Sequence, residues 1–107
     1  MRQPKFRNIK TTVDGIDFAS KAEARRYGEL KLLHRAGQIT DLQHQPRFPL
    51  KVNDQLVCTY VGDFAYKQEG IAVVEDVKSP ATRSHPVYRL KNKLLKALTG
   101  ISIREVS

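Results

Sequence analysis

The sequence predicts an α+β domain in which a helix, three strands, a second helix and a last strand follow one another. Three observations support this order: a helix-capping pattern opens at Ser20, alternating apolar runs occupy residues 46–78, and helical periodicity returns over residues 87–98. A chain of 107 residues has the length of one domain. We therefore expect residues 1–107 to form a single domain.

The first predicted elements are a hairpin and a helix. Asp14-Gly15 lies between β-branched residues, which is a strong hairpin signal. Ser20-Lys21-Ala22-Glu23 matches a capping box and opens a helix. Gly37 is the residue expected to end that helix, because glycine readily adopts the left-handed conformation that follows a helix.

Strands are expected next. The run from Gln45 to Val52 alternates apolar and polar side chains, and its two prolines favour a place at the periphery of a sheet. Further strands are predicted over residues 55–61, 63–67 and 71–78. Residues 79–86 hold two prolines and two serines, which predicts a loop.

The second predicted helix covers residues 87–98 and ends at Gly100. Apolar side chains alternate again over residues 101–105, so a last strand is expected there.

Positive charge dominates the chain, whose formal net charge is +8. Residues 1–10 carry four basic residues and residues 78–96 carry six, without an acid in either run, whereas residues 53–76 carry five acids and one lysine. A basic surface favours a polyanionic partner such as nucleic acid, although solubility alone is an alternative explanation. An acidic centre would repel phosphate unless a divalent cation lay between them.

Membrane and secreted classes are not favoured. No run approaches the roughly 18 apolar residues that a membrane-spanning helix needs, and the basic N-terminus lacks the apolar segment of a signal peptide. The single cysteine, Cys58, excludes an intramolecular disulfide and a multi-cysteine zinc site. We therefore expect a cytoplasmic protein without membrane contact.

Two charged residues fall inside apolar helix stripes. On a helical wheel, Glu23 lies in the apolar arc of the first helix, so its carboxylate is expected to face the core; capping the helix is the alternative and is compatible with it. Lys91 lies between Leu95 and Leu98 on the second helix. Such a lysine either extends along its stem to solvent or meets an anion.

Two acids and a lysine are expected to meet at one edge of the sheet. Side chains two residues apart on a strand share a face, so Asp76 and Lys78 project together while Glu75 projects from the other face. If residues 63–67 pair antiparallel with residues 71–78, Asp63 lies opposite residues 75–77. An ordinary surface ion pair is the alternative.

These residues resemble a known signature. Asp63 followed by Asp76-x-Lys78 resembles the PD-(D/E)xK motif of the restriction-endonuclease-like nuclease superfamily, and the predicted order of elements is similar to that superfamily's core. A longer pattern resembles a small phage- and prophage-associated family assigned to this superfamily: Phe18-x-Ser20-Lys21-x-Glu23, Arg26-Tyr27, Gln45-Pro46, Asp63-Phe64, Glu75-Asp76-Val77-Lys78 and Tyr88-x-x-Lys91. The resemblance spans residues 13–106 and implies a central mixed sheet flanked by helices.

The resemblance implies a DNA endonuclease of phage or prophage DNA metabolism that hydrolyses phosphodiester bonds with Mg²⁺, for which Mn²⁺ substitutes. It implies that Asp63 and Asp76 bind the metal, that the Val77 carbonyl and Glu23 complete the site, and that Lys78 positions or activates the attacking water. Further implied roles are contact with the scissile phosphate by Lys91 and orientation of the water or of Glu23 by Gln45. Glu75 replaces Asp76 as ligand if a bulge shifts the strand.

Candidate phosphate contacts are Arg47, Arg83, Arg89 and Lys93. The chain has no spare domain for reading bases, so we expect recognition of branched or single-stranded DNA, or direction by a phage or host replication, recombination or packaging protein. A homodimer is expected if two strands are cut. Two alternatives are a catalytically silent nucleic-acid-binding or inhibitor module on the same fold, and a basic RNA- or ribosome-associated protein whose acids are ordinary surface groups.

Overall fold

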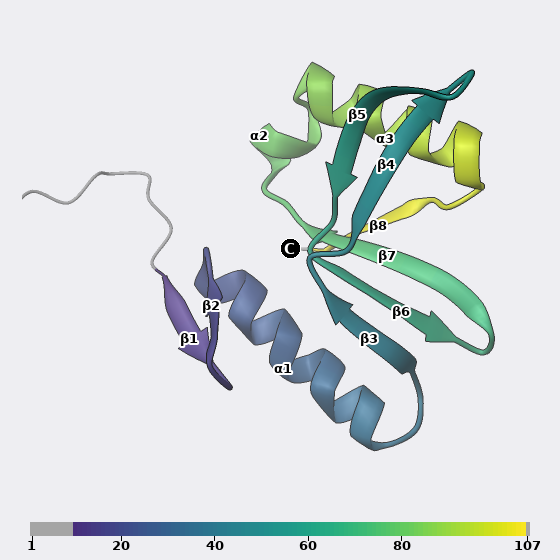
Figure 1. The fold of residues 1–107 in the computed structure, drawn as a ribbon. Helices are drawn as coiled ribbons and strands as arrows, with labels where there is room; N and C mark the ends of the chain where they lie inside the picture. The colour runs from purple at the N-terminus through teal and green to yellow at the C-terminus, as the bar shows by residue number, and fades with distance from the viewer. Residues whose placement is uncertain (1–9, 107) are drawn as a thin grey trace, which may run out of the picture.

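A four-stranded mixed sheet lies at the centre of the fold (Figure 1). The computed structural model describes residues 10–106, so all of the basic N-terminal run except Lys10 lies outside the described residues. The sheet has the order β3-β6-β7-β8, with bounds β3 (Thr40–His44), β6 (Phe64–Gln68), β7 (Ile71–Val77) and β8 (Ile103–Val106). The pair β7–β8 is parallel and the other two pairs are antiparallel. The chain is therefore an α+β protein with a central mixed sheet.

Within residues 10–106, three helices accompany the sheet: α1 (Lys21–Arg35), α2 (Pro80–Arg83) and α3 (Pro86–Thr99). Ser20 caps α1 as predicted, because its hydroxyl accepts a 3.1 Å hydrogen bond from the Glu23 backbone N–H. The Glu23 carboxylate accepts from the Ser20 hydroxyl at 3.3 Å, so the reciprocal bond of a capping box is not the one formed. Gly100, at φ 78°, ends α3 as predicted. No helix within residues 10–106 is long and apolar enough to cross a membrane.

The short helix α2 lies where we predicted a loop. Ser79 accepts a hydrogen bond of 3.3 Å from the Thr82 backbone N–H, and Pro80 occupies the first helical position. Proline suits that position, because its fixed φ is helical and its missing N–H would have had no partner there. One turn of helix therefore forms in a segment whose composition is typical of a loop.

Three tight turns join antiparallel neighbours. The hairpins are β1 (Thr11–Val13) with β2 (Ile16–Phe18), β4 (Arg47–Val52) with β5 (Gln55–Val61), and β6 with β7. Each loop has two residues with positive φ, as a type I′ turn requires: Asp14 and Gly15, Asn53 and Asp54, Glu69 and Gly70. The hairpin predicted at Asp14-Gly15 is confirmed.

The strand predicted at the periphery over residues 45–52 forms as β4, whereas an edge strand of the central sheet, β3, was not predicted. Residues 47–52 form β4, which pairs only with β5 in a separate two-stranded sheet, whereas β3 is the strand beside β6. The segment of β3 is mostly polar, and its pairing with β6 shifts register between Thr40 and Gln43, where Asp41 has a φ of 55°. This irregularity interrupts the apolar alternation by which a strand is recognised in a sequence.

The sheet separates two hydrophobic clusters. Val73 faces the cluster that includes Leu30 of α1, whereas its neighbour Val74 faces the cluster that includes Leu95 of α3. The β4–β5 hairpin contributes Leu50 and Tyr60 to the second cluster and lies against α3 (Figure 1). The end of β7 is thus enclosed by elements on both faces, and its last residues are where the predicted acids lie.

Candidate functional site

The ends of β6 and β7 bring Asp63 and Asp76 together. The register pairs Phe64 with Glu75, which sets Asp63 opposite Asp76 as the predicted pairing requires. The Asp63 backbone N–H donates to Asp76 Oδ1 at 3.0 Å, and the Val77 backbone N–H donates to Asp63 Oδ2 at 2.7 Å. Each aspartate therefore bonds to the backbone of the other strand end.

A cavity of about 560 Å³ opens beside these strand ends. It lies among the N-terminus of α1, the start of β6, the end of β7 and α2, and five of the predicted site residues line it: Glu23, Gln45, Asp63, Val77 and Lys78. Gln45 has a φ of 55°, which is rare for a residue other than glycine, and its backbone N–H donates to the Asp63 carbonyl at 2.9 Å. Ser20, Ser79 and Thr82 also line the cavity.

Two carboxyl groups at this site, those of Glu23 and Asp76, have raised pKa values. Burial and the nearby charge of Asp63 raise the pKa of Glu23 to about 7. Asp76 is fully buried, and burial raises its pKa to about 6 although the positive charge of Lys78 acts in the opposite direction. Its Oδ2 atom makes no hydrogen bond of normal geometry among the described residues, although the Tyr88 hydroxyl lies close enough to lower the pKa of Asp76. Burial is thus the main reason that these two carboxyl groups keep their protons to a higher pH than usual.

This donor set suits a hard divalent cation. Carboxylate oxygens and a backbone carbonyl, here that of Val77, are the ligands that Mg²⁺ prefers in proteins, and Asp76 Oδ2 is a buried acceptor without a hydrogen bond of normal geometry. Within residues 10–106, however, no three His, Cys, Asp or Glu side chains are already arranged around one point as a metal cage. The ligand types therefore fit Mg²⁺, but the side chains of Glu23, Asp63 and Asp76 would have to move for all three to bind one ion.

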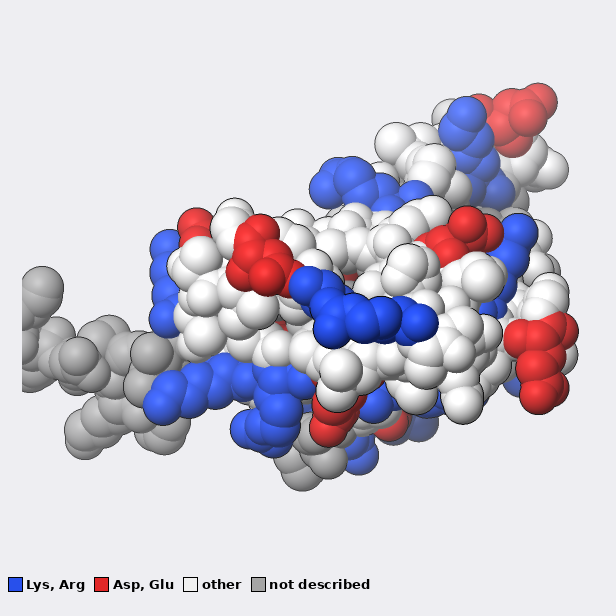
Figure 2. All heavy atoms as spheres, turned by 90° about the horizontal axis from the view of Figure 1, so that it is seen from below, with Lys and Arg blue, Asp and Glu red and all other residues white. Residues whose placement is uncertain are grey.

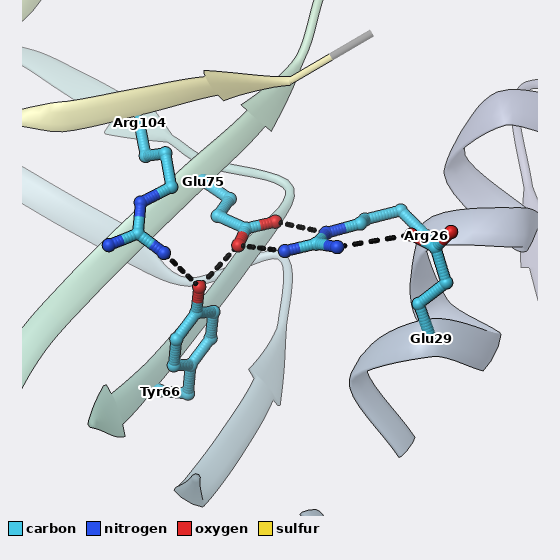
Figure 3. Close-up of polar contacts among 5 residues, drawn as sticks. All are labelled: Arg26, Glu29, Tyr66, Glu75 and Arg104. Atoms are coloured by element: carbon cyan, nitrogen blue, oxygen red, sulfur yellow. Dashed lines mark hydrogen bonds and ion pairs between the residues drawn. The ribbon is translucent and has the colours of Figure 1, made fainter. Parts of the chain in front are cut away.

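Glu75 is engaged elsewhere (Figure 3). Its carboxylate accepts hydrogen bonds from Arg26 of α1 at 2.8 and 2.7 Å, and another from the Tyr66 hydroxyl. Burial opposes ionisation of Glu75, yet the hydrogen bonds from Arg26 and Tyr66 outweigh it and hold the pKa below its ordinary value. Arg104 of β8 donates to the same Tyr66 hydroxyl at 3.0 Å. Glu75 thus has a full set of partners of its own.

Only one of the two candidate lysines lines the cavity of the carboxylates. Lys78 lines the cavity of the carboxylates, and its Nζ atom lies 5.7 Å from the centre of the Tyr88 ring. Lys91 donates to the Thr59 carbonyl at 3.2 Å and lines an adjoining cavity, between β5 and α3. Lys91 therefore does not share the cavity of Glu23 and Asp63.

The comparisons with known proteins identify the family. Residues 3–99 match the family described as "Protein of unknown function (DUF1064)". The chain belongs to this family. The comparisons with curated proteins and with solved structures give no match. All the candidate residues lie within the part of the chain that matches DUF1064.

The predicted phosphate contacts of this DUF1064 protein are spread over several surfaces. Arg89 and Lys93 line a small cavity on the outer side of α3, Arg47 is exposed at the start of β4, and Arg83 ends α2. Seen from below the view of Figure 1, basic and acidic side chains alternate over the surface (Figure 2). The positive charge is thus not gathered into one patch on that face.

Sequence reasoning missed the partners of Glu75. A carboxylate inside an apolar strand, such as Glu75, needs a cation. Arg26 follows Glu23 by three residues and so lies on the same face of the predicted helix, the face expected to point toward the core, and this position could have indicated Arg26 as the cation. Nothing in the sequence indicates that Tyr66 and Arg104 meet, because their contact depends on β6 and β8 both flanking β7. Thr82 was likewise missed, because it lies in the helix that was predicted as a loop.

Proposed function

We propose that this DUF1064 protein is a Mg²⁺-dependent endodeoxyribonuclease of the PD-(D/E)xK type, with its active site in the cavity beside the ends of β6 and β7. The supporting observation is that Glu23, Asp63 and Lys78 come from three elements and line one cavity, whose neighbour Asp76 has a buried oxygen without a hydrogen bond of normal geometry. This is the residue set by which the sequence resembles that superfamily.

Each residue has a role that its position supports. Asp63, Asp76, Glu23 and the Val77 carbonyl would hold the metal, which when bound neutralises phosphate charge and lowers the pKa of water. Lys78 brings an ammonium group into the same cavity, where it donates hydrogen bonds to the attacking water or to the phosphate. Gln45 lines the cavity beside Glu23 and orients that carboxylate or the water.

The proposal extends to the substrate and partners. DNA phosphates contact Arg47, Arg83, Arg89 and Lys93 outside the cavity, with affinity that falls as salt rises. A homodimer, or a phage or host protein of DNA metabolism, directs the cut. Action in the cytoplasm remains a prediction from the sequence.

Cleavage of plasmid, branched and single-stranded DNA tests the proposal. The wild-type protein should cut with Mg²⁺ or Mn²⁺ and not with EDTA, and Asp63→Asn should lose at least about a hundredfold in rate. Asp54→Asn is the matched control, because Asp54 is exposed on the β4–β5 turn, and it should cut like wild type. Absence of cleavage by the wild-type protein, or equal cleavage by Asp63→Asn, would contradict the proposal.

One observation favours a second candidate, a catalytically silent nucleic-acid-binding module on the same fold. The carboxylates of the described chain are not preassembled around a single point. A protein of this kind would bind DNA equally well in EDTA, and Mn²⁺ would leave its melting temperature unchanged. Both properties are measurable on the same preparation as the cleavage.

A further inference from the structure

A second cavity adjoins the candidate active site. Its volume is about 360 Å³, it lies between the end of β5 and the N-terminal half of α3, and it shares Lys78 and Thr82 with the first cavity. The two cavities therefore adjoin at Lys78 and Thr82.

Hydrogen-bond donors line one part of this cavity. The ammonium group of Lys91 donates one of its three protons to the Thr59 carbonyl and keeps two for a ligand. His85 accepts from the Val87 backbone N–H through Nδ1, so the neutral ring carries its proton on Nε2 and offers it as a donor. The first turn of α3 contains no acid, so the partial positive charge of this helix end is not offset there.

Apolar side chains line the other part. Val61 and Val87 both line the cavity and are 40% and 55% exposed, although both are large hydrophobic residues. Tyr60 and Tyr88 also contribute to the lining. A ligand that covers these side chains gains the free energy of apolar burial, which water or a free phosphate cannot supply.

We infer that this second cavity binds one unpaired nucleotide of the DNA strand whose neighbouring phosphodiester lies in the first cavity. Its phosphate meets Lys91, His85 and the N-terminus of α3, and its base packs against Val61 and Val87. A paired base is stacked on both neighbours within the duplex and cannot offer its face to these side chains. The inference rests on the proposed function for the place of the neighbouring phosphodiester, and it makes single-stranded or frayed DNA the preferred substrate.

Fluorescence anisotropy with a short labelled oligothymidine, and with a duplex of the same length, tests this inference in EDTA. We expect the wild-type protein to bind the single strand more tightly than the duplex. Val61→Asn and Val87→Asn should weaken single-strand binding about tenfold and leave duplex binding unchanged. Val57→Asn is the matched control, because Val57 is 58% exposed on the same strand and does not line the cavity.

The outcomes separate this inference from the proposed function. Equal affinity of the wild-type protein for the two DNAs would overturn the inference, as would equal losses in Val61→Asn and Val57→Asn, whereas metal-dependent cleavage would still support the nuclease. A single-strand preference without any cleavage would instead support the inference and contradict the nuclease. Circular dichroism verifies that each variant is folded, and Lys91→Gln, which keeps the apolar wall, should also weaken single-strand binding.

Discussion

Glu75 and Asp76 are adjacent residues with opposite surroundings. Successive side chains on a strand point to opposite faces, so Glu75 meets Arg26 and Tyr66 while Asp76 lies on the side of α3. Both side chains are fully buried, yet only Glu75 has its charge balanced by an ion pair. This difference assigns a structural role to the first carboxylate and leaves the second available for a cation.

Removal of Arg26 should test that structural role. Arg26→Met leaves the buried Glu75 carboxylate without its cation, and we expect a loss of about 3–5 kcal/mol in the free energy of unfolding. Urea denaturation measures this loss. Arg25→Met is the control, because Arg25 is exposed on the same helix and should change stability by less than about 0.5 kcal/mol. Equal effects of the two substitutions would contradict the assigned role.

The pH dependence of stability should report on Glu23. Its pKa is raised from 4.5 to about 7, so the fold favours the protonated carboxyl. The stability that this group contributes is fully present below pH 4.5 and is lost as the pH rises through about 7. In metal-free buffer, the melting temperature of the wild-type protein should therefore fall over this window relative to Glu23→Gln. Parallel curves for the two proteins would show that Glu23 is not coupled to folding.

Sequence reasoning predicts these residues unevenly. The alternation of side chains along a strand predicts that Glu75 and Asp76 lie on opposite faces, and the helical periodicity predicts that Glu23 faces the interior. Both predictions depend only on local periodicity. The position of Lys91 is different: its stripe predicts extension to solvent or contact with an anion, whereas its ammonium group donates to the Thr59 carbonyl of the β4–β5 hairpin, which is a tertiary feature.

At the scale of the elements, the short connection between β5 and β6 packs tightly against β7. Gly62 lies in this connection, and its backbone N–H donates to the Pro46 carbonyl at 3.0 Å. A Cβ atom at this position would lie 2.9 Å from Cγ1 of the buried Val74. The residue before Asp63 is therefore small because the neighbouring core leaves no space for a side chain.

Gly62→Ala should therefore be destabilising. We expect a loss of about 1–3 kcal/mol, since overpacking a filled core forces side chains or backbone to shift. Gly28→Ala provides the control, because a Cβ at that helical position meets nothing within 4 Å. It should be neutral or stabilise the protein by up to about 1 kcal/mol. A Gly62→Ala variant that melted at the wild-type temperature would contradict the close approach of Gly62 to Val74.

Elements with local start and stop signals were predictable, whereas β3 and α2 were not. The helix from Lys21 to Arg35 has a capping box and a terminal glycine in the sequence itself. The strand β3 is polar and irregular, and its place in the sheet depends on pairing with β6, whose paired residues follow it by 20 to 27 positions in the chain. Pairing of that kind leaves no periodic trace in a single sequence.

In the molecule as a whole, acidic and basic groups are arranged around two adjoining cavities. Carboxylates gather in the first cavity, and in the second lysine and histidine donors lie beside apolar side chains. Lys78 lines both cavities and Lys91 lines the second, so each cavity presents an ammonium group to an anion. Metal binding is therefore the property on which the functional account depends.

Thermal unfolding with and without Mn²⁺ tests this property most directly. A ligand that binds only the folded state stabilises it by about 2.7 kcal/mol at a hundred times its Kd, so the melting temperature of the wild-type protein should rise. The rise should disappear in Asp76→Asn and persist in Asp54→Asn, which keeps the candidate site intact. An equal rise in Asp76→Asn, or none in the wild-type protein, would contradict a metal site at the ends of β6 and β7.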